Sequence, residues 1–323
     1  MPRQARLDVP GTLHHVIIRG IERRRIVDDQ EDRDRFAARL GDLAIETGTA
    51  IYAWSLLTNH AHILLRSGSG GLPKFMRRFL TSYSVTYNLR HQRHGHLFQN
   101  RYKSIVCDED TYFQELVRYI HLNPLRAKLV DDLAALERYC WCGHGVVTGK
   151  IKNDWQDREF VLHSFGGTVG TAIRNYRQFV EDGVAMGRRP DLVGGGLIRS
   201  LGGWSEVVSM RRHGDRQMSD GRILGDGDFV QRILEESGER QKHHFSAHDR
   251  RRKIRELIVK TCEEENINPR ELQSGSRRRP VSRVRTRLTR QLVYDHGVPP
   301  ASAARALGVS TSAVSKITRS TER

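Results

Sequence analysis

Two histidines, His60 and His62, have the spacing in this 323-residue sequence that most directly suggests chemistry. They open the run 60–65, His-Ala-His-Ile-Leu-Leu, whose composition is typical of a β-strand. Because side chains alternate between the two faces of a strand, both imidazoles point the same way, and the intervening apolar side chains face a core. Two neutral imidazoles on one rigid face form part of a divalent-metal site. A bare His-x-His also fits two half-exposed histidines on a sheet surface, so other residues must decide between a metal site and a plain surface pair.

A tyrosine and an asparagine four residues apart form the second candidate group. Thr111 and Gln114 have the spacing of a capping box, and Pro124 disfavours helix in the residue before it, so the sequence predicts a helix between these points. Tyr119 and Asn123 leave that helix on one side. The helix would bury an apolar stripe formed by Phe113, Leu116, Val117 and Ile120.

Residues 94–104 mix cations and aromatic rings in a turn-rich segment. This composition suits stacking on bases and pairing with phosphates. We therefore expect DNA contacts from His96, Phe98, Arg101 and Lys103. The whole chain supports a polyanionic partner, because 54 lysines and arginines against 38 acidic residues give it a formal charge of +16.

The elements that must position these residues alternate between the two regular structures. Strands are predicted over 13–20, 51–57 and 60–65, and helices over 29–47 and 72–91 before the helix that carries Tyr119. This β-α-β-β-α order predicts an α+β domain with a helix-backed antiparallel sheet. His14 and His15 are adjacent in the first strand and face opposite ways.

The sequence gives no support for a membrane protein or for a disulfide framework. No apolar run approaches the roughly 20 residues that a spanning helix needs, and the N-terminus has no apolar signal core, so we expect a cytoplasmic protein. Four cysteines are too few for a disulfide scaffold. Cys140, Cys142 and His144 lack a partner pair at zinc-ribbon spacing, which favours small residues around a buried Trp141.

Three motifs in series carry a family resemblance. They are His60-x-His62, then residues 95–104, Gly-His-Leu-Phe-Gln-Asn-Arg-Tyr-Lys-Ser, and then residues 118–127, Arg-Tyr-Ile-His-Leu-Asn-Pro-Leu-Arg-Ala. In this order the chain resembles the REP-associated tyrosine transposases, single-tyrosine members of the HUH endonuclease superfamily, over roughly residues 8–145. One departure is Thr58-Asn59, where a Met-Pro-Asn or similar turn often precedes the histidines. The resemblance favours the metal-binding interpretation of both histidines.

The resemblance implies a ferredoxin-like sheet with the histidines on its central strand. It implies a Mg²⁺ or Mn²⁺ ion held by His60, His62 and Asn123, and Tyr119 as the nucleophile that forms a 5′-phosphotyrosine with single-stranded or hairpin-associated DNA. Arg126, in the third motif, would contact the DNA. Other tyrosines compete for the nucleophile's role: Tyr83 and Tyr87 in a basic, aromatic helix, and Tyr112 on nearly the same helical face as Tyr119.

The C-terminal part has a second specific pattern. Residues 240–290 hold 16 lysines and arginines against 6 acidic residues, and Pro299-Pro300, Gly308 and Ser310 or Thr311 then mark the start, turn and second start of a helix-turn-helix. From about residue 244 the stretch resembles the DNA-binding domain of the bacterial replication initiator. Duplex DNA is the expected partner, and the candidate contacts are Ser312, Ser315, Lys316 and Arg319.

These predictions divide the chain into three parts. Residues 1–145 form the HUH catalytic domain, residues 146–239 a glycine-rich connecting region with short helices, and residues 240–323 a basic, all-α DNA-binding domain. The predicted function is a metal-dependent DNA transposase and single-strand endonuclease. Two alternatives stay open: a DNA-binding regulator with an inactive HUH domain, and a phosphodiesterase in which metal-bound water replaces Tyr119. The sequence also leaves a homodimer open.

Overall fold

The computed structural model describes residues 7, 9, 11–99, 101–187, 189–194, 219–242, 247–276, 278–296 and 298–319. The side chains of 238–242, 247–253 and 319 lie outside this description. The chain divides into two compact units, one of Met1–Leu72 and His96–Arg240 and the other of Pro73–Gly95 and Gln241–Arg323. Among the described residues, no helix is long and apolar enough to cross a bilayer.

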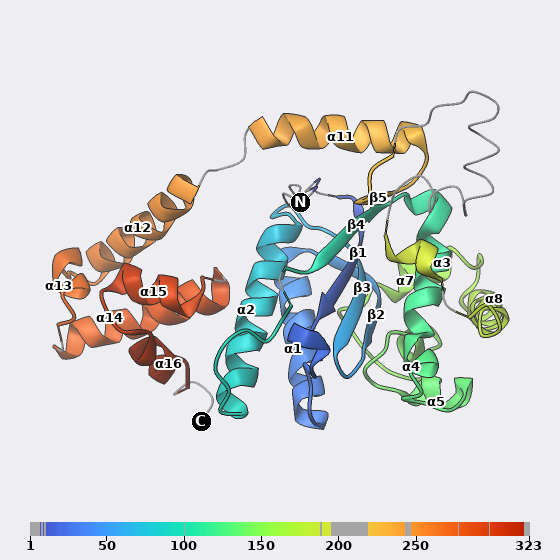
Figure 1. Cartoon of the computed structure of the whole chain (residues 1–323), viewed down its shortest axis with the longest axis horizontal. Coiled ribbons are helices and arrows are strands. Elements are labelled where there is room, and N and C mark those ends of the chain that lie inside the picture. Colours follow the sequence, from blue (N-terminus) through green and yellow to red (C-terminus); the bar gives the residue numbers. More distant parts are fainter. Residues whose placement is uncertain are drawn as a thin grey trace. The chain divides into compact units, whose positions relative to one another are not determined.

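A five-stranded sheet organises the first unit (Figure 1). Its strands are β1 (Leu13–Arg19), β2 (Ala50–Leu56), β3 (His60–Arg66), β4 (Lys103–Cys107) and β5 (Ile223–Leu224), in the order β2-β3-β1-β4-β5. The first four strands pair antiparallel, as the sequence predicts, but β4 and β5 pair parallel. The expected antiparallel sheet is therefore a mixed one. The difference arises because β5 comes from far along the chain and is too short to carry an alternating pattern.

The helices of the first unit confirm the predicted pattern with shifted ends. α1 (Gln30–Thr47) is capped by Asp29, and the helix that carries Tyr119, α3, covers Glu109–His121 and therefore starts before the predicted position. Thr111 and Gln114 do not form a capping box, because Thr111 donates to Asp108 and Gln114 donates to the Ser164 carbonyl. The other helices are η1 (Ile21–Arg23), α4 (Asn123–Arg126), α5 (Leu133–Arg138), α6 (His144–Val147), α7 (Arg158–His163), α8 (Val169–Asp182), η2 (Pro190–Val193) and α11 (Gly227–Lys242).

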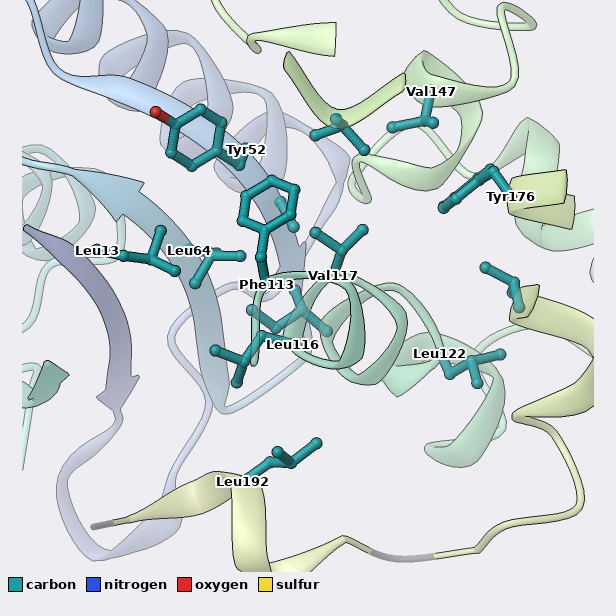
Figure 2. Close-up of a cluster of buried hydrophobic side chains, with 14 of the residues drawn as sticks. Leu13, Tyr52, Leu64, Phe113, Leu116, Val117, Leu122, Val147, Tyr176 and Leu192 are labelled. Carbon is teal, nitrogen blue, oxygen red and sulfur yellow. The ribbon is translucent and has the colours of Figure 1, made fainter. Parts of the chain in front are cut away.

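The core of the first unit lies on both sides of α3. Figure 2 shows Phe113, Leu116 and Val117 of α3 between the sheet residues and the helices that follow α3 in sequence. Burial of the predicted apolar stripe is confirmed, with Phe113 at 6% exposure and Leu116, Val117 and Ile120 at 0%. α7 and α8 contribute Val161 and Tyr176 to the same cluster. Helices from the predicted connecting region thus pack into the core that supports α3.

The second unit is helical and includes a helix from the N-terminal half of the chain. Its elements are most of α2 (Leu72–Arg90), α12 (Ala247–Glu264), α13 (Pro269–Gln273), α14 (Arg279–Arg290), η3 (Gln291–Asp295), α15 (Pro300–Leu307) and α16 (Thr311–Arg319). Val85 of α2 packs against the apolar cluster of the C-terminal helices. In the predicted helix-turn-helix, α15 ends at Gly308 in the left-handed conformation, and Ser310 caps α16 by accepting from the Ala313 amide.

The turn between α15 and α16 has room for glycine alone. Gly308 has a φ of +65°, and a Cβ there would lie 1.7 Å from the carbonyl oxygen of Gln273. We expect Gly308→Ala to destabilise the second unit by clearly more than the roughly 1–2 kcal/mol that a left-handed alanine costs. Gly275→Ala is the matched control, because Gly275 has a φ of +78° but a Cβ contact of 3.6 Å. Urea unfolding with hydrogen exchange in α15 and α16 measures both, and equal losses would contradict the steric argument.

Candidate active site

The strand β3 holds the two predicted metal ligands side by side. His60 and His62 lie on the same face, as predicted, and their ring centroids are 5.3 Å apart. Hydrogen bonding to β1 on one edge and to β2 on the other fixes the backbone of β3. His62 is 3% exposed and His60 is partly exposed. The pair thus sits on an inner strand of the sheet, directly beside the middle strand β1.

The Nδ1 atom of each histidine is occupied by a neighbouring side chain. His60 Nδ1 lies 2.6 Å from Asn59 Oδ1, and Asn59 Nδ2 donates to the Arg23 carbonyl at 3.0 Å, which fixes the orientation of the amide. His60 Nδ1 must therefore be the donor, and its Nε2 keeps a lone pair. His62 Nδ1 lies 2.9 Å from Nε2 of His15, which extends from β1. Each ring is thus held through its Nδ1 atom. Metal-ligating histidines usually have such a hydrogen-bond partner on the ring nitrogen that does not bind the metal.

Burial keeps these imidazoles in the neutral form that binds metal. It lowers the pKa of His60 to about 4, with a further contribution from the Arg19 cation. Burial also lowers the pKa of His15 to about 4. The pKa of His62 falls well below its ordinary value, because burial is reinforced by the neighbouring histidines and by Arg19. Neutral imidazole nitrogens are common ligands of divalent metal ions, so the side chains fit a metal site.

Tyr119 on α3 lies against the histidines. Its ring centroid is 5.6 Å from that of His62 and 5.9 Å from that of His15, in edge-on contacts. The guanidinium carbon of Arg126 is 5.7 Å from the Tyr119 ring centroid. Arg126 is additionally held by the Gly183 carbonyl at 3.2 Å, and its Nε and Nη1 have no hydrogen-bond partner in the described structure. A tyrosine, two histidines and an arginine with unused donors therefore meet at one place.

Electrostatics distinguish Tyr119 from Tyr112. Burial raises the pKa of both phenols. For Tyr119 the Arg126 and Arg19 cations oppose this rise, whereas for Tyr112 neighbouring carboxylates, of which Asp108 is the strongest, add to it. Neighbouring cations therefore favour the phenolate at Tyr119, whereas neighbouring carboxylates oppose it at Tyr112. The competing tyrosines Tyr83 and Tyr87 are each 3% exposed.

Asn123 stands at the start of α4, one turn after Tyr119. It is 8% exposed, and its Nδ2 has no hydrogen-bond partner in the described part of the chain. The described residues include no hydrogen bond between Asn123 and either His60 or His62. Its role as a third metal ligand stays a prediction.

The predicted DNA contacts fall in two places. In the first unit, Arg126 adjoins Tyr119, while Lys103 is exposed and donates to the Val193 carbonyl. In the same unit His96 and Arg101 are exposed and Phe98 is half-buried beside Gly20. On α16 of the second unit Ser312 and Lys316 are exposed and Ser315 is half-buried; Arg319 ends that helix, and its side chain lies outside the described residues.

Sequence reasoning missed the residues that support the histidines. The sequence alone gives His15 no role, because only the pairing of β1 with β3 brings it to His62. Leu192, whose carbonyl lies 3.1 Å from His15 Nδ1, is even more distant in sequence. Period-2 alternation in the first strand places His15 on one face, but the order of the strands in the sheet cannot be seen in the sequence.

The side chains of the Cys-Trp-Cys-Gly-His stretch, residues 140–144, bond to different partners. Cys142 Sγ donates to the His121 carbonyl, and His144 Nδ1 forms a hydrogen bond with the Tyr176 hydroxyl.

Removal of the Arg126 charge should make Tyr119 harder to ionise. Because the cation stabilises the phenolate, Arg126→Gln should raise the pKa of Tyr119 further above its ordinary value. NMR titration of protein labelled at the tyrosine Cζ atoms measures this shift. Tyr112, whose pKa is set by burial and by carboxylates, is the internal control and should titrate unchanged. An unchanged pKa of Tyr119 in Arg126→Gln would show that the Arg126 charge does not affect the ionisation of Tyr119.

Comparison with known proteins assigns part of the chain. Residues 9–123 match the family described as "Transposase IS200 like" (Y1 Tnp). Among solved structures, the "REP associates tyrosine transposase bound to a REP hairpin" is 14% identical, with 49% of this chain and 94% of that chain covered at a TM-score of 0.38. Comparison with curated proteins gave no match. The segment that carries His60, His62 and Tyr119, about a third of the chain, is thus a transposase domain of the IS200-like, Y1 type.

Proposed function

We propose that this chain is a metal-dependent, single-tyrosine DNA transposase of the HUH superfamily, which cuts and rejoins single-stranded or hairpin-associated DNA. The observation that carries the proposal is the contact of the Tyr119 ring with His62, beside His60, within the segment that matches the transposase family. A nucleophile and two neutral nitrogen ligands there have the elements of metal-assisted phosphoryl transfer. The order β2-β3-β1-β4 with helices between strands supports the ferredoxin-like arrangement expected of such a domain.

His60 and His62 would hold a Mg²⁺ or Mn²⁺ ion through their Nε2 atoms, with Asn123 as the proposed third ligand. The ion would act as a Lewis acid on a non-bridging oxygen of the scissile phosphate. The strand fixes the positions of both histidines, and the partners of their Nδ1 atoms fix the directions of the two rings. Arg126 would direct its unpartnered Nε and Nη1 toward the same phosphate.

Tyr119 then attacks the phosphorus. A bond forms between its Oη and phosphorus, the bond from phosphorus to the 3′ oxygen breaks, and that oxygen takes a proton from solvent to become a 3′-hydroxyl. The phenol proton leaves to water, which Arg126 and Arg19 assist by stabilising the phenolate. Attack by another 3′-hydroxyl on the phosphotyrosine reverses these bond changes and joins strands. The phosphotyrosine conserves the bond energy, so rejoining needs no nucleotide cofactor.

The second unit would bind duplex DNA through α16. Its surface presents Ser312 and Lys316 on the second helix of the helix-turn-helix, and the arginine-rich α14 adds positive charge. We propose catalysis in residues 1–145, connection in 146–239, whose helices also pack into the core around α3, and duplex binding in 240–323.

Tyr119→Phe should abolish cleavage and leave DNA binding intact. The change removes one oxygen and keeps the ring against His62, so the fold should persist. With labelled single-stranded hairpin oligonucleotides and Mn²⁺, the wild-type protein should give a slow-migrating covalent species on a denaturing gel, and the variant should give neither that species nor cut DNA.

Tyr112→Phe is the matched control and should retain the covalent species. Cleavage by Tyr119→Phe without an adduct would identify water as the nucleophile. Absence of cleavage by the wild-type protein across the hairpin panel, with binding retained, would favour the regulator with an inactive domain.

Lys316→Ala should weaken duplex binding without affecting cleavage of a short single-stranded substrate. Loss of one phosphate contact should reduce the slope of log affinity against log salt by about 1. Fluorescence anisotropy over a salt series measures this slope on the full chain. Lys150→Ala, an exposed lysine of the first unit, is the control. An unchanged slope for Lys316→Ala would exclude that lysine from the DNA interface.

A further inference from the structure

A chain of two hydrogen bonds leads from a backbone carbonyl to His62. The carbonyl oxygen of Leu192 lies 3.1 Å from His15 Nδ1, and His15 Nε2 lies 2.9 Å from His62 Nδ1. A carbonyl oxygen only accepts, so the proton of a neutral His15 is on Nδ1 and its Nε2 carries the lone pair. That lone pair must accept from His62, which places the His62 proton on Nδ1. His62 Nε2 is left unprotonated.

We propose that His15 and the Leu192 carbonyl are positioning groups that fix the tautomer of His62, so that its Nε2 presents a lone pair to a divalent cation. The inference deepens the proposed function, because it explains how the metal site of that function is prepared. A histidine can ligate a metal only through an unprotonated nitrogen, and the partner of the other nitrogen decides which one that is. His15 has both ring nitrogens engaged, so it acts through His62 and does not itself bind the ion.

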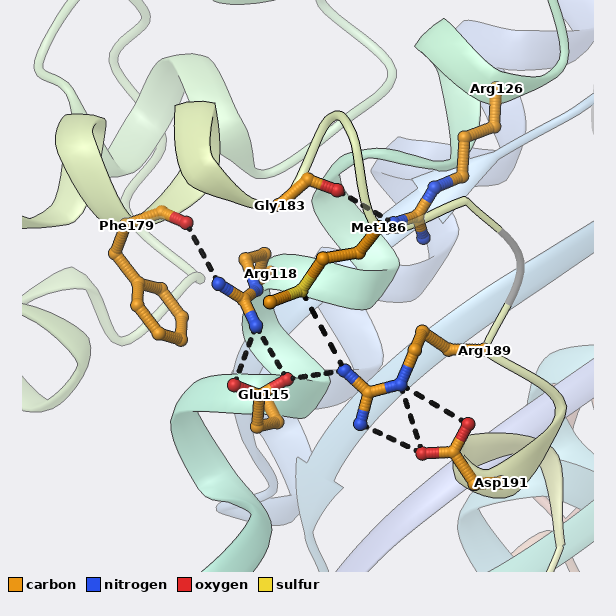
Figure 3. A network of polar contacts seen from close by, with 8 residues as sticks. All are labelled: Glu115, Arg118, Arg126, Phe179, Gly183, Met186, Arg189 and Asp191. Carbon is orange, nitrogen blue, oxygen red and sulfur yellow. Dashed lines mark hydrogen bonds and ion pairs between the residues drawn. The ribbon is translucent and has the colours of Figure 1, made fainter. Parts of the chain in front are cut away.

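The segment that supplies the carbonyl is fixed by ion pairs to the helix that carries Tyr119. Figure 3 shows Arg189 between Asp191 and Glu115, with its Nη2 2.8 Å from Asp191 Oδ2 and its Nη1 2.9 Å from Glu115 Oε2. Glu115 belongs to α3 and also accepts two hydrogen bonds from Arg118, at 2.6 and 2.7 Å. These ion pairs hold residues 189–193 beside α3.

The same segment is anchored by burial and by a second carbonyl. Leu192 is 1% exposed within the core cluster that contains the α3 stripe, so its backbone has little freedom to turn away from His15. The next carbonyl, that of Val193, accepts from Lys103 at the start of β4. The carbonyl of Leu192 is therefore fixed relative to both the sheet and α3, as a tautomer-setting acceptor must be.

The tautomer can be read directly by NMR of the full-length protein. Long-range proton–nitrogen spectra of histidine-labelled protein at neutral pH distinguish Nδ1–H from Nε2–H rings. In the wild type we expect the Nδ1–H form for both His15 and His62. His15→Phe keeps a ring in the core but removes the acceptor, so His62 should lose its single tautomer. His15→Gln supplies an amide oxygen to accept and an amide N–H to donate, and should restore the Nδ1–H form.

His14→Gln is the matched control. His14 is adjacent but faces the other side of the sheet, where its nitrogens bond Thr12 and Ser104. This variant should leave the His62 signals unchanged. A wild-type His62 in the Nε2–H form, or one that stays Nδ1–H in His15→Phe, would overturn the inference. If His15→Phe fails to fold, the tautomer of His62 in the wild type and in His15→Gln still tests the inference.

Mn²⁺ affinity, measured calorimetrically without DNA, separates this inference from the proposed function. His15→Phe should bind Mn²⁺ about 10–100-fold more weakly than wild type, the usual effect of losing such a partner, and His15→Gln should recover most of the loss. The expected tautomer in a wild-type protein that binds Mn²⁺ but forms no covalent DNA adduct would support the positioning role and contradict the transposase chemistry. Equal Mn²⁺ affinity in wild type and His15→Phe would overturn the positioning role, whatever the catalytic result.

Discussion

Burial of α3 against one face of β1 and β3 is the constraint on which the site depends. The face that receives the α3 stripe carries Leu13 and Leu64 of the core and, further along the same strands, His15 and His62. Because core and site share this face, the packing that stabilises the unit also removes water from the imidazoles and keeps them neutral. The same packing sets the distance between Tyr119 and His62. Stability and chemistry at this place are therefore properties of one interface.

The charge around the site suits the proposed phosphodiester substrate. The histidines are uncharged at neutral pH, while Arg19 supplies positive charge that acts on both His62 and Tyr119, and Arg126 supplies positive charge that acts on Tyr119. Fixed cations near a buried phenol favour the anionic product of its ionisation and attract a phosphate before any metal contributes. Asp191 acts on Tyr119 in the opposite direction, but two hydrogen-bonding nitrogens of Arg189 hold its carboxylate.

Local periodicity predicted the parts of the site that lie within one element. Alternation in β3 gave the common face of His60 and His62, and the helical repeat gave the apolar stripe of α3. The glycine turn before α16 was equally local. What could not be predicted depends on pairing between distant segments. His15 meets His62 only through the register of β1 with β3, and Leu192 reaches His15 across 177 residues. The two-residue strand β5 is too short for any periodic signal.

The second unit is built from two separate stretches of chain, and this has a consequence for its origin. The insertion 73–95, which contains most of α2, leaves the first unit after β3 and returns before β4, while the remaining helices follow residue 240. Val85 of α2 packs against the core of those C-terminal helices. A helical module assembled in this way is not a detachable tail. Recombination that exchanged only the C-terminal gene segment would leave α2 facing a foreign core. If α16 has the duplex-binding role proposed above, new target preferences should therefore arise more readily by point substitution on α16 than by swapping whole modules.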